Sequence, residues 1–291
     1  MTLFLQLVVS GLGFGAVYAL GAISLTLIFK TSNVVNFASA SLSTTVALLM
    51  WLALTPLHLP VVLAWLIALA CAMVIGVLVE AVFLRRVEKS AIIIQVVMTL
   101  GLLVAIEGLD GALFGYSPKT LPHVLHGSSF AIGSVLLDRN NALMLAITVL
   151  LAIALYLIYQ HTRLGLALRA VASDRDTASL MGIQTQRYIS LSWAVGVLVA
   201  GVSAILIAPA ISLTPTFMEN VAVFAFAAAV LGGFGSLLGA VVGGLVIGIM
   251  SNLVSGYFSN NLQLTFVFIL ILIVLYIRPN GLFGRPVVSR Q

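Results

Sequence analysis

Long apolar stretches occupy most of this 291-residue chain, and its charged residues fall mainly in short clusters between them. Only 7% of the residues are charged, whereas a soluble domain carries about 25%. A segment in lipid must satisfy its own backbone hydrogen bonds, so apolar stretches of about 20 residues are expected to cross a membrane as helices. The sequence therefore predicts an all-α, polytopic membrane protein with about eight or nine transmembrane helices, in one membrane domain over residues 1–291.

Nine spans can be placed on the sequence, at residues 3–29, 42–54, 61–84, 91–114, 142–159, 189–211, 221–234, a stretch ending near residue 255, and 264–277. The link at 115–141 is expected to be a folded external loop with a short hairpin. Its two histidines, His123 and His126, lack a third ligand, so no metal site is predicted.

The basic residues gather in three clusters, at residues 85–89, 163–187 and 278–290. The positive-inside rule places all three on the cytoplasmic side. With nine crossings the N-terminus lies outside and the C-terminus inside, whereas a re-entrant 221–234 segment would put the N-terminus inside. Because the net charge of +5 sits at span ends, it does not indicate a nucleic-acid partner.

A polar loop at residues 160–188 separates the fifth and sixth spans and carries four of the 13 Lys and Arg residues. Inside it the sequence predicts a helix of about two turns, residues 175–181. Its start and stop signals are Ser173 or Asp174 as the N-cap, Asp176 three residues after Ser173 as in a capping box, and Gly182 at C′. Such a capped helix is suited to being held by a cytoplasmic partner. The alternative is a solvated loop whose basic residues only fix the orientation.

Two further stretches are unusual for plain spans. Residues 31–43 are polar but uncharged, and Asn33 and Asn36 would be costly at membrane depth unless they face protein or water. This segment is either broken or re-entrant, or an ordinary cytoplasmic turn. Residues 225–248 carry small residues at every fourth position, namely Gly232, Ser236, Ala240, Gly244 and Gly248 on one face and Gly235, Gly239 and Gly243 on another. They predict either close helix packing or a helix broken at its GGFGS sequence, with backbone dipoles exposed to a solute.

The acidic residues near the spans are too few and too close to the span ends to form a proton relay. Glu80 lies about one turn before Arg85 and is expected to pair there at the interface, with a buried functional acid as the alternative. Glu107 and Asp110 share a helix face, and they bind a cation, mark an entrance or simply reach the interface. The sequence contains no Walker A loop, HExxH motif or nucleophile elbow. A translocation pathway without its own motor is therefore predicted, not an enzyme.

Four stretches together resemble the branched-chain amino acid permease (LivH-like) family of ABC importers: residues 11–38, 163–183, 229–248 and 278–286. Their order and spacing fit that family along almost the whole chain. One stretch departs from it, because Ser39 and Ala40 stand where the family has His and Gly. Since this stretch lies near the expected path, the solute stays open among branched-chain amino acids, other amino acids, amides and urea.

The resemblance implies a multi-pass permease of the bacterial cytoplasmic (inner) membrane, with no cofactor on this chain. Its implied partners are cytoplasmic ATP-binding subunits, a second related permease or a second copy, and an extracytoplasmic solute-binding protein. The ATP-binding subunits would hold the 160–188 loop at Arg169, Ser173, Asp174, Arg175, Asp176, Ala178, Leu180 and Gly182. The path is expected at Asn33, Asn36, Phe37, Gly232, Gly233, Gly235 and Ser236. The alternative function is a stand-alone ion-coupled carrier or channel that uses Glu107, Asp110 and Glu219.

Overall fold

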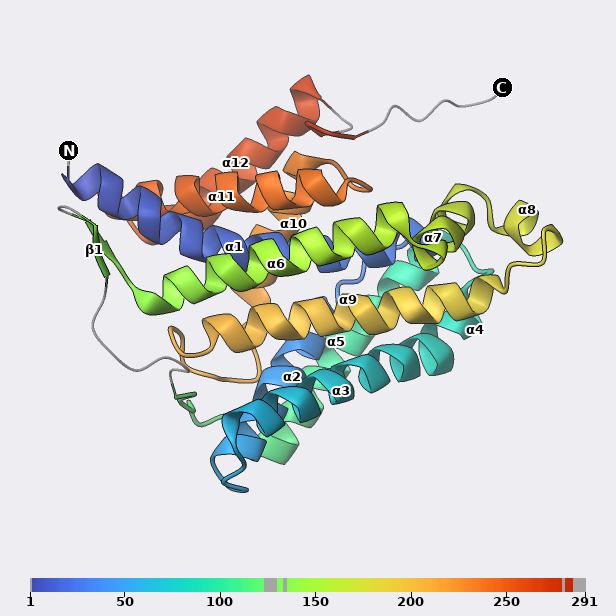
Figure 1. Cartoon of the computed structure of the whole chain (residues 1–291), viewed down its shortest axis with the longest axis horizontal. Coiled ribbons are helices and arrows are strands. Elements are labelled where there is room, and N and C mark those ends of the chain that lie inside the picture. The colour runs from blue at the N-terminus through green and yellow to red at the C-terminus, as the bar shows by residue number, and fades with distance from the viewer. Residues whose placement is uncertain (1, 123–129, 133–134, 279–280, 285–291) are drawn as a thin grey trace.

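The computed structural model describes residues 2–122, 130–132, 135–278 and 281–284, and helices dominate this part of the chain (Figure 1). The helices are α1 (Thr2–Ser32), α2 (Ser39–Leu54), α3 (Val61–Val79), the π-helical turn η1 (Glu80–Leu84), α4 (Arg85–Val87), α5 (Ile92–Phe114), α6 (Arg139–His161), α7 (Arg163–Ser173), α8 (Arg175–Leu180), α9 (Thr185–Ile207), α10 (Glu219–Gly232), α11 (Leu237–Tyr257) and α12 (Leu262–Ile277). The hairpin expected after α5 is present, because β1 (Phe130–Ile132) pairs antiparallel with β2 (Val135–Leu137). His123 and His126 lie outside the described residues.

The apolar helices of the described residues fall into a long group and a short group. Six helical stretches, at α1, α3 to α4, α5, α6, α9 and α11, are long and apolar enough to cross a membrane. The helices α2, α10 and α12 are also apolar, but they have only 16, 14 and 16 residues. Each packs against a longer neighbour, α2 against α9 and the other two against α11. The prediction of an all-α, polytopic membrane protein is confirmed.

The central helix is α1, with α6, α9, α10 and α11 packed around it (Figure 1). Its small residues explain this position, because α11 brings Gly244 against the backbone of Ala19 and Gly248 against the backbone of Gly15. A Cβ atom on either α11 glycine would collide with α1. One small-residue face of α11 therefore serves close packing, as the first alternative for residues 225–248 expected.

The second small-residue face of α11 packs against α10. A Cβ atom on Gly239 would meet the carbonyl oxygen of Gly232, and one on Gly243 would meet that of Ala228. The helix break expected at GGFGS is also present, since α10 ends at Gly232 and α11 starts at Leu237. Close helix packing and a helix break are therefore both present, because one sequence forms two antiparallel helices that pack tightly.

The break between α10 and α11 does not lie midway along the bundle. Phe234 in the turn packs on Phe29 with ring centroids 5.0 Å apart, and Gly235 lies next to Lys30. Phe29 and Lys30 belong to the last turn of α1. The turn therefore lies level with the end of α1 and not midway along the bundle, where broken transporter helices expose their dipoles.

The link between α1 and α2 returns into the bundle. Ser39, the first residue of α2, lines a small internal space together with Gly21, which lies three turns before the end of α1. The irregular residues 33–38 therefore lead the chain back into the interior of the bundle. Asn36 in this link is fully buried. Of the two alternatives for residues 31–43, the structure favours the broken segment.

The described residues of the three basic clusters lie at one end of the bundle, as expected. Arg175 contacts Glu88 and Thr31, and Gly281 after α12 lies on Gly233 in the α10–α11 turn. We call this end, with α4, α7, α8 and the last turn of α1, the basic end. The N-terminus and the β-hairpin lie at the opposite end, called here the far end (Figure 1).

Candidate functional site

The short helix α8 projects from the basic end and is fixed at both termini. At its start, Asp174 Oδ1 accepts a hydrogen bond of 3.0 Å from the backbone N–H of Thr177. At its end, Gly182 has φ +82°, its N–H donates to Ser179, and the N–H of Ile183 donates to Ala178. These two bonds form a Schellman motif, which favours glycine at C′. The predicted helix, the Asp174 cap and the Gly182 stop are confirmed.

The capping box predicted from Ser173 and Asp176 is wrong. Ser173 is the last residue of α7, and Asp176 lies in the first turn of α8 without closing a box. The helix α7 was not predicted from the sequence, although a residue suited to cap its start is present. Thr162 Oγ1 accepts a 3.1 Å hydrogen bond from Gly165 N, which makes Thr162 the N-cap of α7.

The remaining residues predicted for docking divide between inward and outward positions. Ala178 is buried, whereas Leu180 and Met181 are 88% and 79% exposed. Arg169 is directed back to α6, because its Nη1 donates to Gln160 Oε1 at 2.6 Å. The structure therefore presents Leu180 and its neighbour Met181 on the outer face of α8, while Arg169 and Ala178 hold the segment in place.

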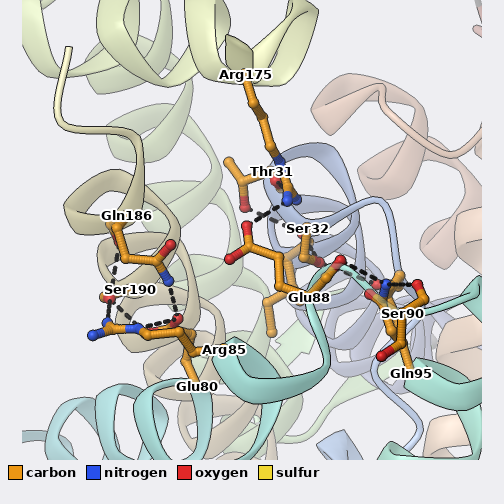
Figure 2. Close-up of polar contacts among 12 residues, drawn as sticks. Thr31, Ser32, Glu80, Arg85, Glu88, Ser90, Gln95, Arg175, Gln186 and Ser190 are labelled. Atoms are coloured by element: carbon orange, nitrogen blue, oxygen red, sulfur yellow. Dashed lines mark hydrogen bonds and ion pairs between the residues drawn. The ribbon is translucent and has the colours of Figure 1, made fainter. Parts of the chain in front are cut away.

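Arg175 forms an ion pair below α8 (Figure 2). Its Nη1 lies 2.7 Å from Glu88 Oε1, and its Nη2 donates to the carbonyl oxygen of Thr31. Gln95 Nε2 donates to the carbonyl oxygens of Glu88 and Ser90, each at 3.0 Å. One side chain of α8 is thus tied to the end of α1 and to the α4–α5 link.

A second polar cluster surrounds Glu80 at the π-helical turn (Figure 2). Its carboxylate pairs with Arg85 at 3.0 Å and accepts hydrogen bonds from Gln186 at 2.6 Å and Ser190 at 2.5 Å. The predicted pairing with Arg85 is confirmed. Protein neighbours bury the Glu80 carboxylate. This cluster fixes the start of α9 directly after the α8 segment.

The residues predicted for the path come from two segments that a row of aromatic rings connects. Phe37 packs on Phe226 of α10 with centroids 6.2 Å apart, Phe226 on Phe234 at 5.6 Å, and Phe234 on Phe29 at 5.0 Å. Periodicity could not indicate this row, because two of its members lie in the first 40 residues of the chain and the other two lie after residue 220. It joins the 33–38 link to the α10–α11 turn.

Other predicted path residues form turns, cap a helix or allow close helix packing. Asn33 has φ +58° and ends α1, and Asn36 Oδ1 accepts from the N–H of Ala38 at 3.1 Å. Gly233 and Gly235 have φ +93° and +102° in the turn. Gly232 packs against α11, and Ser236 Oγ accepts from Gly239 N as the N-cap of α11. Among the predicted path residues, Asn33 and Phe37 are exposed.

A cavity of about 620 Å³ opens toward the far end between α1, α10, α11 and α12. Its lining combines aromatic rings with uncharged polar side chains: Phe14, Tyr18, Phe217, Phe224, Asn220, Ser251, Asn252, Ser255, Asn260, Asn261 and Gln263. Tyr18 and Phe224 stack with centroids 4.9 Å apart. No charged side chain of the described residues lines this cavity. Its lining residues come from distant parts of the sequence, so no local pattern predicts the cavity.

The acidic residues considered for ion coupling lie elsewhere. Asp110 is buried and accepts a 2.9 Å hydrogen bond from Thr45 Oγ1. Glu107 lies beside Glu219 of α10. Within the described ranges, no group of three or more His, Cys, Asp or Glu side chains is arranged to hold a metal ion.

The sequence matches a known protein family along most of its length. Residues 7–276 match the model of the family described as branched-chain amino acid transport system / permease component. The chain is 31% identical to the high-affinity branched-chain amino acid transport system permease protein LivH of Escherichia coli K12, over 99% of this chain and 97% of the relative. It is 29% identical to BraD of Pseudomonas aeruginosa, a permease protein with the same description, over 99% and 98%.

Among solved structures, PsaBC from Streptococcus pneumoniae in complex with Fab matches with a TM-score of 0.46 and 15% identity, over 96% of this chain and 91% of that one. The family model and the curated relatives each cover nearly the full length of the membrane domain. This chain therefore belongs to the branched-chain amino acid ABC transporter permease family.

Proposed function

We propose that this chain is the permease subunit of an ABC importer that moves a branched-chain or related small amino acid, or an amide- or urea-like solute, across the bacterial cytoplasmic membrane. The observation that carries the proposal is the outer face of α8. A short helix, capped at Asp174 and Gly182, presents Leu180 and Met181 at the basic end. Exposed large apolar side chains on a rigid polar segment suit a protein partner.

In this proposal the partner at α8 is a cytoplasmic ATP-binding subunit. ATP hydrolysis resides on that subunit, and this chain is a transport subunit without a cofactor. A second related permease or a second copy completes the path, and an extracytoplasmic solute-binding protein delivers the solute. Closure of the ATP-binding subunits drives transport only if they bind the inward and outward states with different free energies. A helix with both ends capped is stiff enough to transmit that difference.

The lining of the far-end cavity suits a solute that is uncharged or zwitterionic. Its polar side chains are carboxamides and hydroxyls, and each of these groups can both donate and accept hydrogen bonds. Such a lining can bind the ammonium and the carboxylate of an amino acid without placing a fixed charge in the cavity. It suits an amide- or urea-like solute for the same reason.

The first test is purification of the tagged chain in mild detergent with every co-purifying protein identified. The proposal expects ATP-binding subunits and a second permease chain. Reconstituted with its solute-binding protein, the complex should take up radiolabelled leucine, valine or urea when ATP is supplied, after the ion gradients are collapsed. Purification of the chain without any ATP-binding protein, together with uptake that requires an ion gradient, would instead establish the carrier function.

A further inference from the structure

Arg175 opens the helix α8, but its side chain is directed into the molecule and not toward the exposed face of that helix. The guanidinium lies between the end of α1 and the α4–α5 link, in contact with Thr31 and Glu88 (Figure 2). In the ion pair, the side chains of Arg175 and Glu88 are only 29% and 28% exposed. The guanidinium of Arg175 therefore binds groups of its own chain, whereas the side chains of Leu180 and Met181 are exposed and can contact a partner.

The contact with Thr31 caps α1. The last four carbonyl oxygens of a helix have no donor inside the helix, and the carbonyl of Thr31 is one of them because α1 ends at Ser32. A cation at this position is also attracted by the negative end of the helix dipole. Directly afterwards, Asn33 takes φ +58° and the chain leaves the helix. Arg175 thus holds α1 at the point where the 33–38 link begins.

The contact with Glu88 fixes the other side of the guanidinium. Glu88 follows α4, and its carbonyl oxygen accepts a hydrogen bond from Gln95 in α5. The α4–α5 link therefore offers Arg175 a carboxylate in a defined place. An Arg guanidinium is a planar fork with five N–H donors, so it can bind this carboxylate and the Thr31 carbonyl at a fixed relative angle.

We propose that Arg175 is the positioning residue that transmits displacement of α8 to the 33–38 link, and through this link to Phe37 and the aromatic row. The proposal rests on the proposed function, in which an ATP-binding subunit displaces α8. When α8 moves, the guanidinium either carries the end of α1 with it or releases the Thr31 carbonyl. In both cases the link between α1 and α2 changes its position relative to α10.

The test follows the 33–38 link directly and does not depend on knowing the solute. Cys71 is the only cysteine in the chain, so Cys71→Ser gives a background without thiols in this subunit. Phe37→Cys then places one thiol on the exposed part of the link. The labelling rate of this thiol by a methanethiosulfonate reagent is measured in the assembled complex, without nucleotide and with ATP plus vanadate.

Arg175→Lys is the informative variant, because it keeps the charge but replaces the fork by a single ammonium group. We expect the ATP-binding subunit to co-purify at the normal level and to hydrolyse ATP. We expect the nucleotide-dependent change in labelling rate to fall about tenfold, within the range of ordinary couplings between sites. Glu88→Gln should reduce the same change, and the Arg175→Lys/Glu88→Gln double variant should be no worse than Arg175→Lys alone, because both act on one contact.

Arg86→Lys is the matched control. Arg86 lies in α4 close to Glu88, is exposed, and undergoes the same chemical replacement. It should leave the labelling change as in the parent. A labelling change of parental size in Arg175→Lys would overturn the proposal. Equal losses in Arg175→Lys and Arg86→Lys, or a loss that only follows reduced ATP-binding subunit in the complex, would also overturn it.

Failure of this inference can be distinguished from failure of the proposed function. If the parent complex contains no ATP-binding subunit, the proposed function itself is wrong, and this appears before any variant is compared. If the Cys71→Ser chain with its native Phe37 takes up solute, and the Phe37→Cys parent hydrolyses ATP and changes its labelling rate, the function stands. The variants then decide only whether Arg175 carries the movement.

Discussion

Gly244 of α11 lies directly on the backbone of Ala19 in α1, where a side chain would have no room. We predict that Gly244→Ala destabilises the folded protein by about 1–3 kcal/mol, because a methyl group must push the two helices apart. Thermal unfolding in detergent measures this. The control is Gly101→Ala in α5, whose added Cβ meets no atom within 4 Å. Equal melting temperatures for both variants would contradict the close packing of α11 against α1.

Gly182 should be sensitive for a different reason. No neighbouring atom restricts a side chain there, but its φ of +82° is unfavourable for any residue with a Cβ. Gly182→Ala should weaken the end of α8 by about 1–2 kcal/mol, and Gly182→Asn by less, since Asn tolerates this conformation better. Retention of the ATP-binding subunit during purification should follow the order Gly, Asn, Ala. A steric origin would instead make Asn, the larger residue, the worse substitution.

Asp174 gives α8 a defined dependence on pH. Its carboxylate accepts hydrogen bonds from the backbone and side chain of Thr177, which lowers the pKa of Asp174 below its usual value. The charged form is thus favoured in the folded helix. The resulting stabilisation is complete above the unfolded pKa, about 3.9, and is lost as pH falls through the lower folded pKa.

Hydrogen exchange of the α8 amides, corrected for the intrinsic effect of pH, should therefore show constant protection from pH 8 to about pH 5. Protection should decrease only when the pH falls below the ordinary Asp range. Asp174→Asn keeps an acceptor that cannot titrate, so its protection should not change with pH. Loss of protection in the native protein near pH 6 would show that another group controls α8.

Arg85 supports the buried carboxylate of Glu80, and removing it leaves that carboxylate with neutral donors only. The Arg85 side chain is 44% exposed and that of Glu80 is 2% exposed. We expect Arg85→Ala to cost about 2–3 kcal/mol, below the usual loss for a fully buried pair because solvent screens the Arg85 side of the interaction. Arg86→Ala, at an exposed neighbour, should change stability by less than about 0.5 kcal/mol. Both are measured by denaturant unfolding of the purified chain.

The sequence predicted the features whose cause is local. The apolar stretches indicated the helices, and Asp174 and Gly182 marked the ends of α8 because caps are made by residues three to five positions apart. The same logic failed at Ser173, which has the right residue type for a cap but belongs to α7. Local signals allowed either Ser173 or Asp174 as the N-cap of α8. Ser173 is excluded only because α7 extends through it.

The sequence by itself determined that this chain is a multi-span helical protein with a capped helix in its basic loop. Tertiary structure decided which partners the charged and aromatic side chains have. Arg175 meets Glu88 and Thr31 across 87 and 144 residues, and Phe37 meets Phe226 in another helix. Such contacts depend on how closely helices approach, which the glycines of α11 set by direct backbone packing. A pattern of residue types along one helix gives no information on the helix that lies opposite.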